Sequence, residues 1–168
     1  MNQKYVDCIT EIELINNLKD KLLKDGINAE NTIIVTVSTD YSSIVGQHLR
    51  HSLSFGREIC EGFGIDVPYP DETWDARYIK SLKKALVSHR DLFANNKSLL
   101  LVEAGVIRGG NYRFVTDYIK KDFSNKILTL ALYENIGSLF KSDYVGEYYD
   151  NTIEDLTFWW EEDNKHWD

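Results

Sequence analysis

Apolar residues near the start of the chain recur with the period of an amphipathic helix. The pattern predicts a helix over residues 10–25. Thr10 and Glu13 have the spacing of a capping box, and Gly26 is a typical residue just beyond a helix end. The apolar positions of this helix are Ile12, Ile15, Leu18, Leu22 and Leu23.

Three later segments also favour helices. One starts near Tyr41 and has apolar spacing that allows it to continue to Gly64, and the others cover residues 76–93 and 112–123. Both prolines and several acids fall in residues 64–75, which are interpreted as a loop.

Short apolar runs between these helices predict buried strands. The fourth run alternates apolar and polar residues, whereas the first three are almost wholly apolar. Strands alternating with helices favour parallel β-α-β units, so the expected class is α/β, with a central mostly parallel sheet flanked by helices. Ligands of such sheets bind at the carboxyl ends of the strands. The strands are expected at residues 33–37, 99–102, 127–133 and 144–149.

Composition narrows the class of protein. The 168 residues are 43% apolar and 27% charged, which predicts one globular domain over residues 1–168. We find no signal peptide and no apolar run near the ~20 residues of a membrane span, so we expect a cytoplasmic protein without a membrane partner. A net charge of −8 argues against nucleic-acid binding. A protein with this net charge can still bind a polyphosphate if its acidic residues bind Mg²⁺ and local backbone dipoles supply the remaining attraction. Cys8 and Cys60 are interpreted as buried apolar residues, and we expect no disulfide.

The segment after the strand at 99–102 has the form of a phosphate-binding turn. Glu103 ends the apolar run, and Gly105, Gly109 and Gly110 allow the torsions of a tight loop before the next helix. Free N–H groups and the positive end of the helix dipole would stabilise an anion there. The alternative is an ordinary strand-turn-helix junction, with Glu103 bonded to backbone or to an arginine.

This segment resembles the phosphoribosyl-pyrophosphate motif of the type I phosphoribosyltransferases. Glu103 takes the first acidic place, Gly109 and Gly110 the glycine pair, and Asn111 the place of the final hydroxyl residue. The chain departs from the motif where Ala104 replaces the second acid, and also at Ile107 and Arg108.

Three further stretches extend the resemblance to the purine-type branch. Residues 33–40 match the first core strand and the pyrophosphate loop, and residues 143–146 match an aspartate-aromatic-hydrophobic-glycine element. Residues 158–161 are similar to the aromatic ending of bacterial purine transferases, within a hood-like aromatic segment at about 143–162.

The resemblance implies a ligand and a set of roles. The ligand is phosphoribosyl pyrophosphate or a nucleotide 5′-phosphate, with Mg²⁺ as cofactor, a purine-type base as acceptor and a homodimer as an open option. Glu103 is the expected catalytic residue, and Glu103 and Asp40 are the expected metal ligands. Tyr144 and Trp160 are expected to bind the base. The pyrophosphate loop is Ser38, Thr39 and Asp40, and the phosphate-binding residues are Gly105, Val106, Ile107, Arg108, Gly109, Gly110 and Asn111.

Other interpretations stay open. The expected activity is transfer of ribose 5-phosphate to a base, but Ala104 and Ile107 favour an inactive protein of the same fold that senses nucleotides or binds proteins. A third interpretation is an α/β enzyme that binds metal through the acidic loop 66–75. Residues 38–40 are also typical of a helix cap, and the C-terminal tryptophans also suit packing in a core or an interface.

Overall fold

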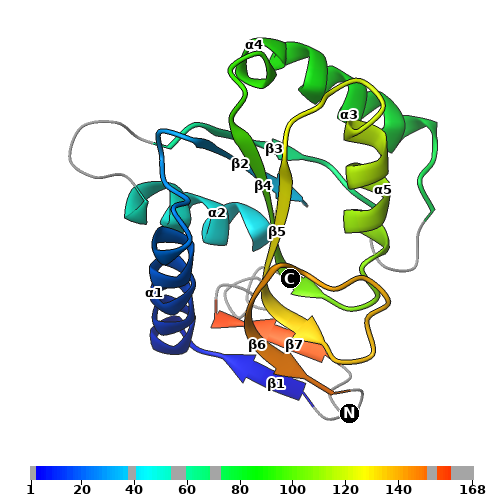
Figure 1. Cartoon of the computed structure of the whole chain (residues 1–168). Helices are drawn as coiled ribbons and strands as arrows, with labels where there is room; N and C mark the ends of the chain where they lie inside the picture. The colour runs from blue at the N-terminus through cyan, green and yellow to red at the C-terminus, as the bar shows by residue number, and fades with distance from the viewer. Residues whose placement is uncertain (1–2, 38–40, 54–59, 69–72, 151–154, 160–168) are drawn as a thin grey trace.

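A computed structural model describes residues 3–37, 41–53, 60–68, 73–150 and 155–159. Its main element is a five-stranded sheet in the order β3-β2-β4-β5-β6, in which every described pair is parallel (Figure 1). The α/β class with a mostly parallel sheet is therefore confirmed. The strands are β2 (Thr32–Val37), β3 (Gly62–Ile65), β4 (Ser98–Val106), β5 (Ile127–Asn135) and β6 (Tyr144–Tyr149).

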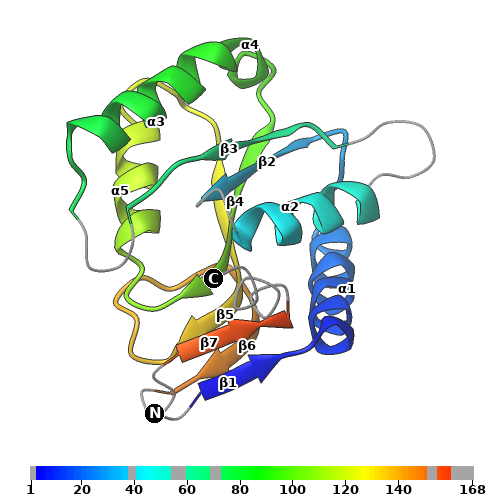
Figure 2. The ribbon, with the colours of Figure 1, turned by 180° about the vertical axis from the view of Figure 1, so that it is seen from behind.

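Helices cover both faces of this sheet, as Figure 2 shows from behind. Leu100, Val102 and Ala104 of β4 contact the core shared with α1 and α2. Leu99 and Leu101 point the other way and contact the core shared with α3, α4 and α5. The helices are α1 (Cys8–Lys24), α2 (Tyr41–Ser52), α3 (Ala76–Ser88), α4 (Arg90–Phe93) and α5 (Gly110–Ile119).

A second, two-stranded sheet joins residues from the two ends of the described chain. Strand β1 (Gln3–Val6) pairs in parallel with β7 (Asp155–Phe158), and both lie beside β6 near the carboxyl ends of β4 and β5 (Figures 1 and 2). Neither strand is predicted from the sequence, because four residues are too few to display a reliable alternation.

Several predicted boundaries are corrected. The helix predicted to continue to Gly64 is wrong at its end, because Gly62 and Phe63 belong to β3 and pair with β2. A Cβ added at Gly62 would lie 2.5 Å from the Ile34 carbonyl oxygen. Strands β2 and β3 therefore approach each other closely at this position, which requires glycine. The helix predicted over 76–93 is interrupted at His89, whose ring stacks on Phe63 at 4.4 Å.

The first helix begins earlier than its capping-box pattern predicts. Asp7 is the N-cap, and its carboxylate accepts a hydrogen bond from the Thr10 N–H at 2.7 Å, so Thr10 lies inside the helix. Strand β4 is longer than predicted and includes Glu103 and Gly105. The predicted loop at Gly105 therefore begins only after Val106.

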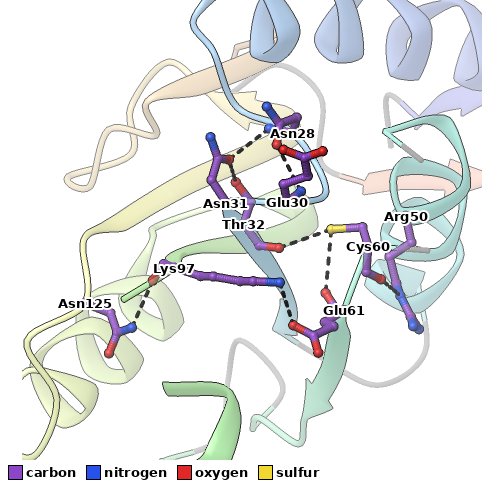
Figure 3. Close-up of polar contacts among 9 residues, drawn as sticks. All are labelled: Asn28, Glu30, Asn31, Thr32, Arg50, Cys60, Glu61, Lys97 and Asn125. Atoms are coloured by element: carbon purple, nitrogen blue, oxygen red, sulfur yellow. Dashed lines mark hydrogen bonds and ion pairs between the residues drawn. The ribbon is translucent and has the colours of Figure 1, made fainter. Parts of the chain in front are cut away.

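Polar contacts fasten the segment before β3 at the amino ends of the strands (Figure 3). The Arg50 Nε–H donates to the Cys60 carbonyl at 2.8 Å, and the Cys60 thiol donates to the Thr32 carbonyl at 3.3 Å. Lys97 pairs with Glu61 at 2.8 Å. These contacts join α2, β2 and β4 around Cys60, whose thiol pKa is raised by burial. Both cysteines are free, in line with the expectation of no disulfide.

A short return connects β5 to β6. The eight residues between these parallel strands include Asp143, whose carboxylate accepts from the backbone N–H and the hydroxyl of Thr129 at 2.8 and 3.0 Å. The buried carboxylate of Glu134 accepts from the Ser142 N–H at 2.8 Å. The return therefore runs from the carboxyl end of β5 back to Thr129 near its start, and Phe140 within it lies next to Gly109 in the turn after β4.

None of the described helices is long and apolar enough to cross a membrane.

Candidate phosphate-binding site

Glu103 is the buried acid of the candidate site. It lies on β4, is 8% exposed, and accepts a long hydrogen bond of 3.4 Å from the Asn111 side-chain amide on α5. Burial raises the pKa of this carboxyl to about 8, because the low-dielectric surroundings disfavour its charge, while the bond from Asn111 acts in the opposite direction. In the unliganded protein Glu103 is therefore mainly protonated at neutral pH.

Gly109 allows the chain to turn from β4 into α5. Its φ of +74° is in the left-handed region, and it is the residue before the first turn of α5. A Cβ at this position would lie 2.3 Å from the Phe140 Cβ, so the β5–β6 return contacts the turn closely. Gly110 differs, because a Cβ there would meet nothing within 4 Å. Of the three predicted turn glycines, only Gly109 has a positive φ.

Tyr112 anchors the first turn of α5 beneath this glycine. Its hydroxyl donates to the Leu130 carbonyl and lies 3.3 Å from the Leu101 carbonyl, so the helix start is tied to β5 and β4. Its ring contacts that of Phe140 with centroids 5.5 Å apart. The first turn of α5, directly after Gly109, is therefore fixed to two strands of the sheet.

A pocket of about 400 Å³ opens beside the turn. Val106 is the predicted phosphate-binding residue that does not line it, because its side chain is buried in the core shared with α5. Arg108 and Gly110 are exposed at its edge. The pocket brings together Glu103, Gly105, Ile107, Arg108, Gly109, Gly110 and Asn111.

Four lining residues are not predicted from the sequence. Trp74 stacks on Phe114 with centroids 4.0 Å apart and planes 12° apart, while Arg113 and Asp117 are exposed on α5. With Gly110, the three α5 residues have the spacing of one helix face, which is the signal that could have identified them. Trp74 carries no such signal, because it precedes α3 in an irregular segment.

The start of α2 is tied to the same end of β4. The Ser42 hydroxyl accepts a hydrogen bond from the Ala104 N–H at 3.1 Å, and the Ala104 methyl is buried in the core shared with α1 and α2. The predicted pyrophosphate loop, Ser38, Thr39 and Asp40, immediately precedes α2 but lies outside the described residues.

Of the two predicted base-binding residues, Tyr144 is described and does not line the pocket. Tyr144 begins β6, and its hydroxyl is 2.8 Å from the carboxylate of Asp25, the residue that caps the C-terminus of α1. Trp160 lies outside the described residues. The neighbouring Trp159 donates its indole N–H to the buried carboxylate of Glu11 at 2.6 Å.

The site suits an anion more clearly than a fully preformed metal centre. The first-turn N–H groups of α5 lie at the pocket, and Arg108 adds a cationic side chain. Within the described part of the chain, no three His, Cys, Asp or Glu side chains gather as metal ligands. Glu103 can still supply one oxygen ligand, because Mg²⁺ is commonly bound by one or two carboxylates together with phosphate oxygens of the substrate.

The chain has the fold of the purine-type type I phosphoribosyltransferases, because it aligns over almost its whole length with solved structures of such proteins. The purine phosphoribosyltransferase of Pyrococcus horikoshii aligns with a TM-score of 0.67 over 95% of each chain at 18% identity. The xanthine-guanine-hypoxanthine phosphoribosyltransferase of Helicobacter pylori aligns with a TM-score of 0.65 at 14% identity, over 98% of this chain and 95% of that one. A hypothetical protein from Neisseria gonorrhoeae with bound ppGpp aligns with a TM-score of 0.69 at 14% identity, over 98% and 94%. No family model and no curated protein sequence matches the chain.

Proposed function

We propose that this chain binds the ribose 5-phosphate group of phosphoribosyl pyrophosphate or of a nucleotide at residues 105–111. The observation that carries this proposal is the pocket in which the buried carboxyl of Glu103 lies beside the start of α5 and the left-handed turn at Gly109. The turn and the helix start supply donors for a phosphate, and Glu103 supplies polar oxygens for the ribose hydroxyls. The fold places this turn at the carboxyl end of a parallel strand, where ligands of such sheets bind.

The roles within the site follow from position. The N–H groups of Gly110 and Asn111 would donate to phosphate oxygens, and Arg108 would add a bidentate cationic contact. Glu103 would accept from ribose hydroxyls once it loses its proton. The Asn111 amide, already bonded to Glu103, would keep that carboxyl oriented.

Mg²⁺ is part of the proposal. Glu103 would bind it together with phosphate oxygens of the ligand, and Asp40 is the second predicted ligand, outside the described residues. The buried carboxyl fits this role, because a nearby cation favours its charged form and would lower the raised pKa. When bound, Mg²⁺ neutralises the charge that pyrophosphate gains as it leaves.

Transfer of ribose 5-phosphate to a purine-type base is the proposed reaction. The sugar carbon becomes cationic as pyrophosphate departs, so the chain must fix the phosphates and exclude water from that carbon. The turn at 107–111 would fix the 5′-phosphate, and Glu103 would orient the sugar. A purine-type base is proposed because purine phosphoribosyltransferases share this fold. The resemblance implies the homodimer, and the cytoplasmic location is the expectation drawn from the composition of the chain.

A second candidate function is ligand binding without transfer. Ala104 favours it, because this buried methyl stands where the motif has a second acid. The protein would then sense a nucleotide or bind a protein partner through the same fold.

A pair of glycine variants tests the phosphate site. Gly109→Val should abolish binding of ribose 5-phosphate in calorimetry, because a β-branched residue cannot adopt the positive φ and collides with Phe140. Gly110→Ala is the matched control and should retain the fold, since its Cβ enters open space. Equal binding by wild type and Gly109→Val would refute the site.

Turnover separates the two candidate functions. The protein is incubated with phosphoribosyl pyrophosphate, Mg²⁺ and a panel of purines and pyrimidines, and pyrophosphate and nucleotide are followed. Nucleotide formation with any base excludes the non-catalytic candidate. Binding of ribose 5-phosphate without turnover supports it.

A further inference from the structure

The return between β5 and β6, residues 136–143, contacts the turn that leads into α5. A Cβ added at Gly109 would lie 2.3 Å from the Phe140 Cβ and 3.0 Å from the Ser138 hydroxyl oxygen, at the point where φ is +74°. The Phe140 ring also contacts that of Tyr112 in the first turn of α5. Both views of the chain show the return beside this turn (Figures 1 and 2). The position of the return therefore limits the space available to the backbone at Gly109.

Glu134 is a buried acid next to this return. It lies on β5 opposite Val106, the last residue of β4, and its side chain is fully buried. One carboxylate oxygen accepts a hydrogen bond from the Ser142 N–H at 2.8 Å. The other oxygen, Oε1, accepts no hydrogen bond from the residues that the structure describes. An ionised carboxylate in such surroundings is costly unless a cation lies close to it.

Lys141 supplies a cation and joins the two ends of the return. Its ammonium nitrogen lies 3.6 Å from the Glu134 Oε1 and donates a hydrogen bond to the Ile136 carbonyl at 2.9 Å. Ile136 is the first residue of the return and Lys141 is near its end, so one side chain connects both ends to the buried carboxylate. The Lys141 side chain is 56% exposed, and water therefore weakens its attraction to Glu134. Such a pair adds little net stability, because screening and desolvation offset the attraction.

We propose that Glu134 and Lys141 are positioning residues for the phosphate-binding turn, and that their ion pair holds the return against Gly109 before a ligand arrives. The inference rests on the proposed ribose-phosphate site. Neither residue lines the pocket, so they act through Phe140 rather than by touching the ligand. If the return moves away, Gly109 becomes free to adopt the other torsions that glycine populates readily. Holding the turn in one conformation lowers the entropy that ligand binding would otherwise cost.

Calorimetry with ribose 5-phosphate tests this role in the full chain. Lys141→Met removes the ammonium group and keeps most of the aliphatic side chain. It should weaken ribose 5-phosphate binding at least about fivefold, the lower end of typical coupling between two sites. Lys141→Arg keeps the charge and should retain wild-type affinity. Lys80→Met makes the same change at an exposed lysine of α3 outside the pocket, and it should leave the affinity unchanged.

Nuclear magnetic resonance separates positioning from a purely structural role. In unliganded Lys141→Met, the backbone amide resonances of Gly109 and Gly110 should shift, because the turn loses its fixed conformation. The amide of Gly62 on β3 is the internal reference and should not move. A purely structural role for Lys141 would lower the Tm and leave the resonances of the turn unchanged.

Glu134→Gln is a second variant of the same pair. The glutamine keeps an acceptor for the Ser142 N–H but loses the charge that attracts Lys141, so it should also weaken ribose 5-phosphate and shift the turn amides. If both variants bind ribose 5-phosphate as wild type does, or bind it less tightly with unshifted turn amides, the positioning role is wrong and the phosphate site stands. If wild type itself does not bind ribose 5-phosphate, the proposed function is wrong and the positioning role with it.

Discussion

Glu103 is a carboxyl whose protonation is set by the fold. The side chain is 8% exposed near the end of β4 and accepts a long hydrogen bond from the Asn111 amide. Desolvation raises its pKa to about 8 from an ordinary value of 4.5. A folded pKa above the unfolded one means that the proton stabilises the fold, so the contribution is complete below about pH 4.5 and is lost as the pH rises through 8.

Glu103→Gln should flatten the dependence of stability on pH. Wild type should lose free energy of unfolding relative to this variant, on the order of 5 kcal/mol from pH 4.5 to above pH 8, because each pH unit of the window corresponds to about 1.4 kcal/mol. Urea unfolding at pH 5, 7 and 9 measures the difference. Glu13→Gln, which changes an exposed carboxyl on α1, is the control and should follow wild type. Parallel curves for wild type and Glu103→Gln would contradict the raised pKa.

At the scale of elements, α1 and β7 are joined by one buried polar contact. Glu11 is fully buried in the first turn of α1, and its carboxylate accepts from the Trp159 indole N–H at 2.6 Å. The other carboxylate oxygen lies 3.7 Å from the His48 Nδ1. Burial raises the pKa of Glu11, and the bond from Trp159 lowers it in part. The indole thus favours the charged form and fixes the end of β7 on the helix.

Trp159→Phe should destabilise the protein by about 1–3 kcal/mol, because it leaves a buried acceptor without its donor. The loss should be larger at pH 8 than at pH 5, since the variant raises the Glu11 pKa further and the charged form carries the penalty. Thermal or urea unfolding at both pH values measures it. In a Glu11→Gln background the same substitution should show no such pH dependence, and a pH dependence that persists there would assign the effect to another group.

Helices and strands with a long or regular pattern of apolar residues could be predicted from the sequence. The remaining elements depend on tertiary contacts, which a local pattern does not show. The apolar strand at Leu99 and the periodic helix through Leu18 are found as expected, because burial imposes a regular pattern on them. Strand β3 contains Gly62 and Gly64 and exists through its pairing with β2, which no local pattern encodes. Glu103 and Gly109, which both line the pocket, could be singled out from the sequence because they follow the apolar run at 99–102. Trp74 could not, because long-range packing brings it to α5.

For the whole molecule, two cores on opposite faces of one sheet meet at the strand that carries the site. Leu100 contacts one core and Leu101 the other, so β4 is buried on both sides before it reaches Glu103. A ligand at its carboxyl end is therefore coupled to the stability of the entire fold, since binding there requires both layers in place.

Ribose 5-phosphate at a hundred times its dissociation constant should raise the free energy of unfolding by about 2.7 kcal/mol. For a chain of 168 residues this corresponds to a rise in Tm of about 5–10 °C. Scanning calorimetry with and without the ligand measures the shift, and Gly110→Ala should show a shift in the same direction. An unchanged Tm under saturating conditions would mean that the ligand binds no folded site.

The pairing of β1 with β7 also constrains how the chain is made. Gln3 and Asp155 are partners in the same small sheet, although they are about 150 residues apart along the chain and Asp155 is synthesised later. During translation β1 leaves the ribosome without its neighbour, while β2, β4 and β5 can already assemble. The edge of β1 therefore stays open for pairing with other chains until β7 emerges, which makes a nascent-chain chaperone most useful to this protein in that interval.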